Sequence, residues 1–258
     1  MTDARPYDGY HKYTGAVASN YESDRQVEAH WWKEDEFIRE FFRDKVVSSL
    51  LDTPVGTGRF FRHYTGASTV VGVDVSEDML NEARLKLPLL PSATIGSVER
   101  GDILSLRFND RQFSLAVVWR LLHLIPVDLL PRAVGELCRV TDRELLVQTY
   151  TVVPTQNSAT KISPLRAVLG RGRRIARRLV GGLRRVSVPS VSSIGTDPKP
   201  ATDDVCSAGD KPWSHIQAAY HSQELIDSLF AKNGFVPAFA KVLDRYDNCD
   251  VRVTVYQR

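Results

Sequence analysis

The chain has 258 residues, of which 43% are hydrophobic and 25% are charged, a composition typical of a globular protein and not of a disordered or fibrous chain. Its length predicts one domain with an insertion, and its three scattered cysteines, which form no CxxC pair, disfavour a disulfide scaffold and a zinc site. The cysteines therefore predict a protein without a metal. We expect it to be cytoplasmic, because no apolar run is long enough for a secretion signal or a membrane-spanning helix.

The first 45 residues are rich in aromatic and charged side chains. Apolar residues recur between Glu34 and Arg43 at the spacing of one helical face, which predicts a helix there. We interpret residues 1–45 as a group of helices that caps the rest of the domain.

A glycine-containing loop between two short apolar runs is the central feature of the sequence. The runs, Ser48–Leu51 and Thr69–Val73, have the length of strands, and the loop Asp52–Gly58 lies between them, followed by a helix-like segment. Glycines allow a tight turn on which a ligand can lie, and Asp74, at the end of the second run, can accept hydrogen bonds from both hydroxyls of a ribose. This order predicts half of a nucleotide-binding βαβ unit.

The next segments alternate between helix and strand signals. Ser76 is expected to cap a helix that runs to about Leu87 and is ended by Pro88. Val98–Arg100 is expected to form a short third strand. The near-continuous apolar run Phe113–Trp119 predicts a strand that is buried on both faces.

Arg120 and His123 follow this buried strand. Ligands of open α/β sheets bind beyond the carboxyl ends of the strands, so both residues are expected to border the cleft. Arg120 can hold a carboxylate or phosphate of an acceptor, and His123 has a pKa suited to a general base, with His215 and His221 in reserve. The alternative for His123 is a hydrogen-bonded structural residue at the start of the next helix.

A basic insertion, residues 152–212, follows an expected helix over Asp128–Val140 and a fifth strand over Glu144–Tyr150. Its first part, Lys161–Val186, contains nine basic and no acidic residues, and its apolar residues are three and four positions apart. This pattern predicts an amphipathic helix that lies on an anionic membrane surface. A lid over an anionic substrate and a basic segment without a specific partner stay open, whereas nucleic acid is disfavoured because aromatic residues are absent. Residues 187–211 are expected to form a flexible linker.

The C-terminal part, residues 213–258, returns to the domain pattern. It predicts a helix over Ser222–Lys232 and an antiparallel hairpin of strands over Phe235–Leu243 and Asp250–Tyr256. Valines alternate with polar residues in the last run, which predicts a half-exposed strand.

The expected fold class is α/β: a Rossmann-like, seven-stranded mixed sheet with helices on both faces and a basic helical insertion after the fifth strand. We expect a cap over residues 1–45, a nucleotide-binding core over 46–151, the insertion over 152–212, and a segment over 213–258 that completes the sheet.

At the glycine loop the chain resembles the class I S-adenosylmethionine-dependent methyltransferases of the small-molecule type. Their first motif, an acid followed by alternating glycines, stands here as Asp52–Gly58, with Pro54 in place of the first glycine. Asp74, which follows the loop by about 20 residues, and the downstream Gly101-Asp102 add to the resemblance. A dinucleotide dehydrogenase is disfavoured, because Phe61 stands where a third glycine is needed.

The resemblance implies S-adenosylmethionine as cofactor. The residues that it places at the cofactor are Asp52, Pro54, Gly56, Gly58, Asp74, Val75, Asp102, Ile103, Trp119 and Tyr21. It implies that Asp102 binds the adenine amino group, that Ile103 packs on the ring, and that Tyr13 or Tyr21 touches the methionine end. The alternative for these tyrosines is that they cover the edge of the sheet.

The resemblance also implies methyl transfer by direct displacement, in which the protein mainly holds its ligands in line. We expect a small-molecule, glycan or lipid-linked acceptor that is methylated on oxygen, with His123 as base and Arg120 as anchor. The basic segment 161–186 would place the reaction at the inner face of a membrane. The alternatives are an RNA methyltransferase that uses the basic insertion and a non-catalytic binding module with the same fold.

Overall fold

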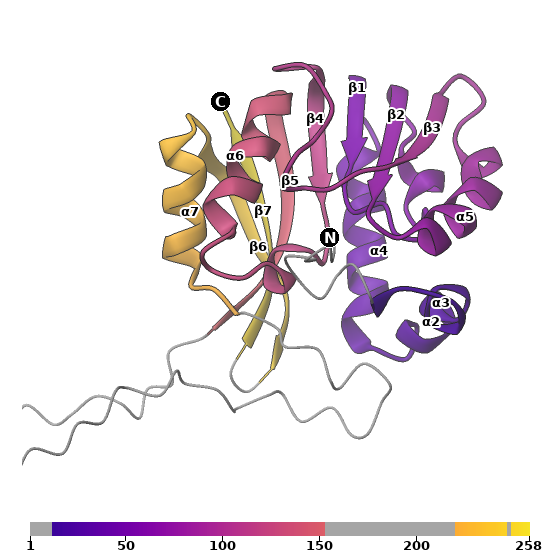
Figure 1. Cartoon of the computed structure of the whole chain (residues 1–258), viewed down its shortest axis with the longest axis horizontal. Coiled ribbons are helices and arrows are strands. Elements are labelled where there is room, and N and C mark those ends of the chain that lie inside the picture. Colours follow the sequence, from indigo (N-terminus) through magenta and orange to yellow (C-terminus); the bar gives the residue numbers. More distant parts are fainter. Residues whose placement is uncertain (1–11, 153–219, 247–248) are drawn as a thin grey trace, which may run out of the picture. The chain divides into compact units, whose positions relative to one another are not determined.

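The computed structural model describes residues 12–152, 220–246 and 249–258, which belong to one compact unit (Figure 1). The predicted basic helix over 161–186, the linker over 187–211 and His215 lie outside the described residues.

A seven-stranded mixed sheet is the centre of the fold, which confirms the expected fold class. The strand order is β3-β2-β1-β4-β5-β7-β6, and β1 to β5 are paired in parallel, whereas β7 is antiparallel to both β5 and β6. The strands are β1 (Val47–Asp52), β2 (Ala67–Asp74), β3 (Ile95–Arg100), β4 (Phe113–Val118), β5 (Thr141–Val152), β6 (Val236–Tyr246) and β7 (Cys249–Gln257).

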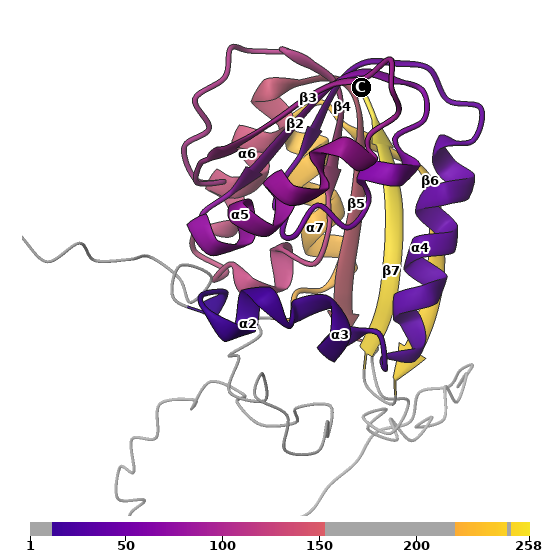
Figure 2. The same ribbon diagram turned by 90° about the vertical axis from the view of Figure 1, so that its right-hand side faces the viewer.

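Helices cover both faces of this sheet (Figure 2). Helices α4 (Ala29–Phe42) and α5 (Glu77–Lys86) lie on one face, and α6 (Leu130–Val140) and α7 (Gln223–Lys232) lie on the other. The short helices α2 (Ala16–Ser19) and α3 (Tyr21–Arg25) lie at one end of the sheet, and short 3₁₀ turns are η1 (Phe61–His63), η2 (Leu87–Leu89) and η3 (Leu122–Leu124). The predicted N-caps of α5 and α7 are confirmed: the Ser76 hydroxyl accepts the Met79 N–H, and the Ser222 hydroxyl accepts the Leu225 N–H.

Two apolar cores lie on the two faces of the sheet. One core contains α6 and α7 and includes Leu137, and the other contains α4 and η1 and includes Ile38. Val118 of β4 belongs to the first core and Val117 to the second. Strand β4 is therefore buried on both faces, as its apolar run predicted.

The structure corrects the expected helix after the glycine loop. Only the 3₁₀ turn η1 lies there, because the chain turns back at Tyr64 and enters β2 at Ala67. The rings of Phe61 and Tyr64 are fully buried in the core that contains α4. A longer helix would need residues that this short connection lacks.

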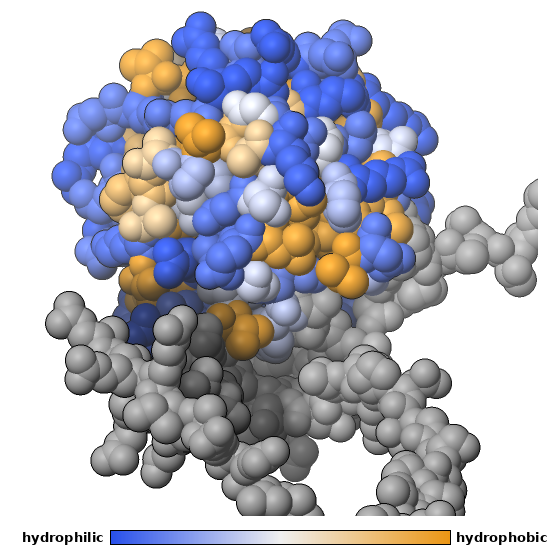
Figure 3. Space-filling view, turned by 90° about the vertical axis from the view of Figure 1, so that its left-hand side faces the viewer, coloured by the Kyte–Doolittle hydropathy of each residue, from blue (hydrophilic) through white to orange (hydrophobic). Residues whose placement is uncertain are grey.

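The expected exposure of the last strand is also wrong. Strand β7 is buried except at Arg252 and Gln257, because it lies between β5 and β6 and is covered on both faces. Strand β6 takes the edge of the sheet instead, and residues 236–241 are all exposed. Figure 3 shows the side of the unit on which this edge lies, where apolar patches stand between hydrophilic ones.

Candidate functional site

The loop after β1 has the two left-handed backbone positions that its glycines predict. Gly56 has φ 55° and Gly58 has φ 72°, a region that favours glycine. A Cβ on Gly56 would meet no atom within 4 Å, whereas a Cβ on Gly58 would lie 2.7 Å from the ring of Phe61. Gly56 therefore leaves space free beside the backbone, and Gly58 allows the close packing of Phe61.

Asp74 closes β2 and ties this loop to the sheet. Its carboxylate accepts the Gly56 N–H at 3.0 Å and the Ser76 N–H at 2.9 Å. Burial raises the pKa of Asp74 to about 6, although these N–H donors lower it. The carboxylate is thus held in one orientation at the carboxyl edge of the sheet.

Asp52 lies beneath the loop and not in the pocket wall. It is the last residue of β1, it is 2% exposed, and its carboxylate accepts the Tyr64 hydroxyl at 2.7 Å. Burial raises its pKa to about 7; the charge of Asp74 adds to this shift and the Tyr64 hydrogen bond opposes it.

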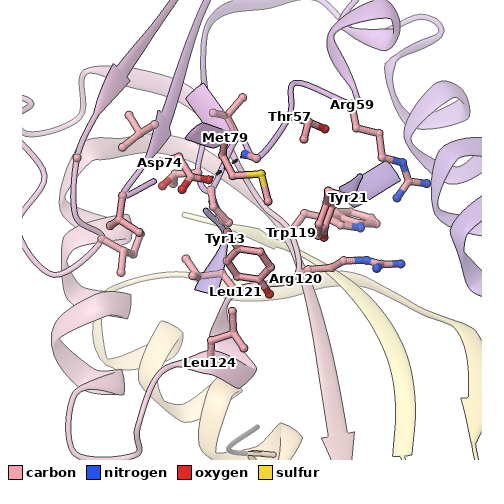
Figure 4. A pocket seen from close by; sticks show the side chains of 18 of the residues that line it. Tyr13, Tyr21, Thr57, Arg59, Asp74, Met79, Trp119, Arg120, Leu121 and Leu124 are labelled. Carbon is pink, nitrogen blue, oxygen red and sulfur yellow. Dashed lines mark hydrogen bonds between the residues drawn. The ribbon is translucent and has the colours of Figure 1, made fainter. Parts of the chain in front are cut away.

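A pocket opens between the glycine loop, the carboxyl ends of β2 and β4, and the N-terminal cap (Figure 4). The predicted site residues that line it are Pro54, Gly56, Asp74, Val75, Ile103, Trp119, Arg120 and Tyr21. Asp52, Gly58, Asp102 and His123 are not among its lining residues. The carboxylate of Asp102 accepts the Leu104 N–H of its own turn at 2.9 Å, so Asp102 holds the loop that presents Ile103 to the pocket.

The N-terminal cap supplies an aromatic wall of the pocket. The rings of Tyr13 and Tyr21 both line it and meet edge to face with centroids 5.8 Å apart. The Ser76 hydroxyl donates to the Tyr13 carbonyl, and the Thr57 hydroxyl donates to Glu22 at 2.6 Å. The cap is therefore bonded to both the glycine loop and the start of α5.

A buried ion network at one end of the pocket contains residues that the sequence analysis missed. Glu34 of α4 is fully buried, and its carboxylate accepts hydrogen bonds from Arg59 at 2.8 Å and from Arg120 at 2.9 Å. Arg120 also donates to Glu28 at 3.0 Å. The guanidinium of Arg59 stacks on Trp31, 3.4 Å from the ring centroid.

One sequence signal could have pointed to this network. Glu34 is four and eight residues before Ile38 and Phe42, which are both fully buried, so it lies on the apolar face of α4. An acid on an apolar helix face needs a partner of opposite charge.

Arg120, the expected acceptor anchor, lines the pocket in an unusual backbone conformation. Its φ is 53°, in the left-handed region, and its N–H donates to the buried side chain of Gln148 at 2.9 Å. Its guanidinium Nε, Nη1 and Nη2 all donate to the carboxylates of Glu28 and Glu34. An acceptor anion would have to share these donors, and the anchor role stays a prediction.

His123, the expected base, lies in η3 behind the pocket wall. Its ring packs edge to face on Tyr150 with centroids 4.6 Å apart, and its Nδ1 has no partner among the described residues. Burial lowers the pKa of His123 to about 3, and the positive charge of Arg120 adds to this effect. The imidazole is therefore neutral at neutral pH.

The ring of His221, the reserve base, is engaged in hydrogen bonds to the backbone. Its Nε2 lies 2.9 Å from the Ile125 carbonyl and 3.2 Å from the Leu122 carbonyl, so this N–H holds the turn after β4. Over the described part of the chain, no group of three or more histidine, cysteine, aspartate or glutamate residues could hold a metal ion. None of the helices in that part is both long and apolar enough to cross a membrane.

Comparisons with known proteins agree with this geometry. Residues 50–144 match the family model described as a methyltransferase domain, and no curated protein matches the chain. The magnesium protoporphyrin IX methyltransferase (ChlM) from Synechocystis PCC 6803 with bound SAM is similar over 100% of both chains, with 12% identity and a TM-score of 0.61. The N-methyltransferase NodS from Bradyrhizobium japonicum WM9 in complex with S-adenosyl-l-homocysteine is similar over 97% of this chain and 99% of that chain, with 10% identity and a TM-score of 0.59.

These comparisons agree with the expected family and cofactor. Residues 50–144 match a methyltransferase domain, and the fold is shared with solved methyltransferases that hold SAM or S-adenosyl-l-homocysteine. Identities of 12% and 10% are evidence for the fold and not for the acceptor.

Proposed function

We propose that this S-adenosylmethionine-dependent methyltransferase methylates an oxygen of a small acceptor molecule in the pocket beneath its N-terminal cap. The observation that carries the proposal is the continuity of the pocket. It is lined at one end by Gly56 and Asp74 and extends to Tyr13, Leu121 and Leu124. A cofactor cradle and an apolar acceptor region therefore share one cavity.

The pocket residues fit the cofactor. When bound, S-adenosylmethionine supplies a methyl group that its sulfonium already activates. Asp74 would accept the ribose hydroxyls and Ile103 would pack on the adenine. Asp102 lies outside the pocket lining, and it would have to reach the adenine amino group with the carboxylate oxygen that does not hold Leu104. Gly56 fits this role because a side chain there would project into open space beside the loop. Arg59 would bind the carboxylate of the amino-acid tail, while Glu34 holds its guanidinium in place.

The acceptor would lie between the tyrosines of the cap and the leucines after β4. Tyr13 and Tyr21 offer hydroxyl groups, and Leu121 and Leu124 offer an apolar surface. Among the described lining residues the charged side chains are Arg59, Arg120 and Asp74, and Asp74 is assigned to the ribose. The remaining charged side chains are thus positive, which disfavours a cationic acceptor and favours a neutral or anionic one.

The chemistry of the site favours an acceptor oxygen that ionises easily. His123, the expected base, does not line the pocket, and a pKa of about 3 makes its neutral imidazole a weak proton acceptor, so it would give an acceptor hydroxyl little help. A carboxylate or an acidic hydroxyl needs little help from such a base. Arg120 would stabilise the anionic oxygen if it shared a donor with the acceptor.

An acceptor linked to a membrane is a further part of the proposal that rests on the sequence. The basic segment 161–186 has an apolar stripe and nine positive charges, which suits an anionic membrane surface. Flotation of the full chain with anionic vesicles, compared with a variant that lacks residues 161–186, tests this part. Equal recovery of the two proteins in the soluble fraction would remove the membrane from the proposal.

Isotope labelling can identify the acceptor directly. A cell extract is incubated with the protein and cofactor that carries an isotope-labelled methyl group, and labelled products are sought by mass spectrometry. We expect a small labelled product that is absent when Asp74→Asn replaces the wild type. Label in RNA would favour the RNA methyltransferase alternative, and a protein that fails to bind the cofactor in calorimetry would be a non-catalytic module.

A further inference from the structure

The edge strand β6 presents an unusual apolar surface. Residues 236–241 are exposed and begin with the apolar sequence Val-Pro-Ala-Phe-Ala. Val236 is 59% exposed and Phe239 is 48% exposed. No other described strand pairs with the outer side of β6, which is the last strand of the sheet. An exposed apolar edge of this kind marks an interaction surface or an aggregation hazard.

A groove lies beside this edge, between α4 and β6. An aromatic column lines it: the rings of Phe41 and Phe37 stack at 6.2 Å, and those of Phe37 and Phe239 stack at 6.3 Å. Leu243 and Val255 complete its apolar floor. The groove is therefore continuous with the apolar edge, and the two form one surface, which we call the β6 surface.

The two rims of the groove carry opposite charges. On the α4 rim, Glu36 and Glu40 line the groove, and their ion-pair partners Arg39 and Arg43 do not. Lys33 of α4 also lines the groove, but its charge is balanced by an ion pair with Asp244 of β6 at 2.8 Å. On the β6 rim, Lys241 lies 5.9 Å from the Phe37 ring centroid and has no carboxylate within ion-pair distance among the described residues.

We propose that the β6 surface is the interface between two copies of this chain, related by a two-fold axis. A two-fold interface requires a surface that complements itself, so each feature must meet its counterpart on the other copy. Here an apolar centre is flanked by acids on one rim and a lysine on the other. The axis brings Phe239 against the aromatic column of the partner and Lys241 against the partner's Glu36 and Glu40.

Side-chain packing dominates this interface, and strand pairing across it is short. Pro237 has no N–H to donate, and irregularities in the pairing with β7 lie between Pro237 and Phe239 and between Val242 and Asp244. These features limit a regular edge to Phe239–Val242. The proposal is independent of the acceptor, because none of these residues lines the cofactor pocket.

Analytical ultracentrifugation of the full chain over a concentration series tests the proposal. We expect a monomer–dimer equilibrium that Phe239→Glu weakens by about tenfold or more. Lys241→Glu is expected to weaken the dimer, and so is Glu36→Lys combined with Glu40→Lys. The triple variant Lys241→Glu, Glu36→Lys and Glu40→Lys is expected to restore the dimer, because it exchanges the charges of the two rims. Lys232→Glu, an exposed change at the end of α7, is the matched control.

Thermal unfolding and cofactor binding of each variant separate loss of the dimer from loss of the fold. A wild-type chain that stays monomeric at every concentration would overturn the proposal, as would a triple variant that dimerises no better than Lys241→Glu. A monomer in which the outward-facing β6 amides, those not bonded to β7, are protected from hydrogen exchange would also overturn it. That result would assign the β6 surface to a segment of this chain outside the described residues.

Discussion

The carboxylate of Glu34 accepts two parallel hydrogen bonds from the guanidinium of Arg120, at 3.1 and 2.9 Å. Glu34 belongs to α4 in the N-terminal cap, and Arg120 lies just beyond the carboxyl end of β4, so the bond joins the cap to the carboxyl edge of the sheet. The same carboxylate holds Arg59, which directly follows the glycine loop. One buried acid therefore fixes three parts of the pocket wall relative to one another.

Removal of this charge is expected to destabilise the fold strongly. Glu34→Gln keeps the shape of the side chain but leaves two buried arginines without their shared counter-charge. We expect the free energy of unfolding to fall by about 3–5 kcal/mol in denaturant titrations, the usual cost of breaking a buried ion pair from one side. Glu99→Gln in β3, at an exposed position outside the network and the β6 surface, is the control and should change it by less than about 0.5 kcal/mol. Equal effects of the two changes would show that the network contributes little.

Loss of the Asp74 carboxylate is expected to weaken cofactor binding. Asp74→Asn replaces an acceptor of two backbone N–H groups by a side chain with an NH₂ group, and it removes the charge assigned to the ribose. We expect calorimetry with S-adenosylhomocysteine to show an affinity lower by about tenfold to a hundredfold. Asp128→Asn, at an exposed position, should leave the affinity unchanged. An unchanged affinity in Asp74→Asn would place the ribose elsewhere.

The buried carboxyl of Asp52 is expected to make the stability of the unliganded protein depend on pH. Its pKa is about 7 in the folded protein and 3.8 as the ordinary value, so the folded state binds more protons than the unfolded state between these pH values. The contribution of Asp52 to the free energy of unfolding therefore falls as pH rises from about 4 to about 8. Asp52→Asn keeps an acceptor for Tyr64 and removes this titration.

Comparison with Asp52→Asn is necessary because other groups titrate in the same range. His123, with its pKa lowered to about 3, makes the folded protein more stable as pH rises through this range, which is the opposite sign. Denaturant unfolding at a series of pH values should show the variant gaining stability relative to the wild type as pH rises. A constant difference would mean that Asp52 titrates normally.

Two glycine-to-alanine changes are expected to have opposite effects. Gly56→Ala places a side chain in the left-handed region, at a cost of about 1–2 kcal/mol, and puts a methyl group beside the loop where the cofactor is expected. We expect lower stability and weaker binding of S-adenosylhomocysteine. Gly135→Ala, within α6 and with open space around its Cβ, should stabilise the protein by up to about 1 kcal/mol. Stability is measured by denaturant unfolding, and equal binding by both variants would argue against the role of Gly56.

Most of the sheet and the cofactor loop were predictable because they depend on neighbours in the chain. The continuous apolar run of β4, the caps Ser76 and Ser222, and the spacing from Gly56 to Asp74 are local patterns, and the structure contains each of them. A backbone hydrogen bond or a side-chain cap needs only residues a few positions away. The family resemblance rests on the same short stretches.

The ion network at the end of the pocket and the burial of the strands near the edge of the sheet depend on residues that are distant in the sequence. Glu34 meets Arg59 and Arg120 across 25 and 86 positions of sequence, and a pattern of charges does not say which acid will meet which arginine. The valines of β7 alternate like a half-exposed strand, but their burial follows from the place of β7 between β5 and β6. Burial and ion pairing are properties of a packed interior, in which the order of the strands fixes which side chains share the space from which water is excluded.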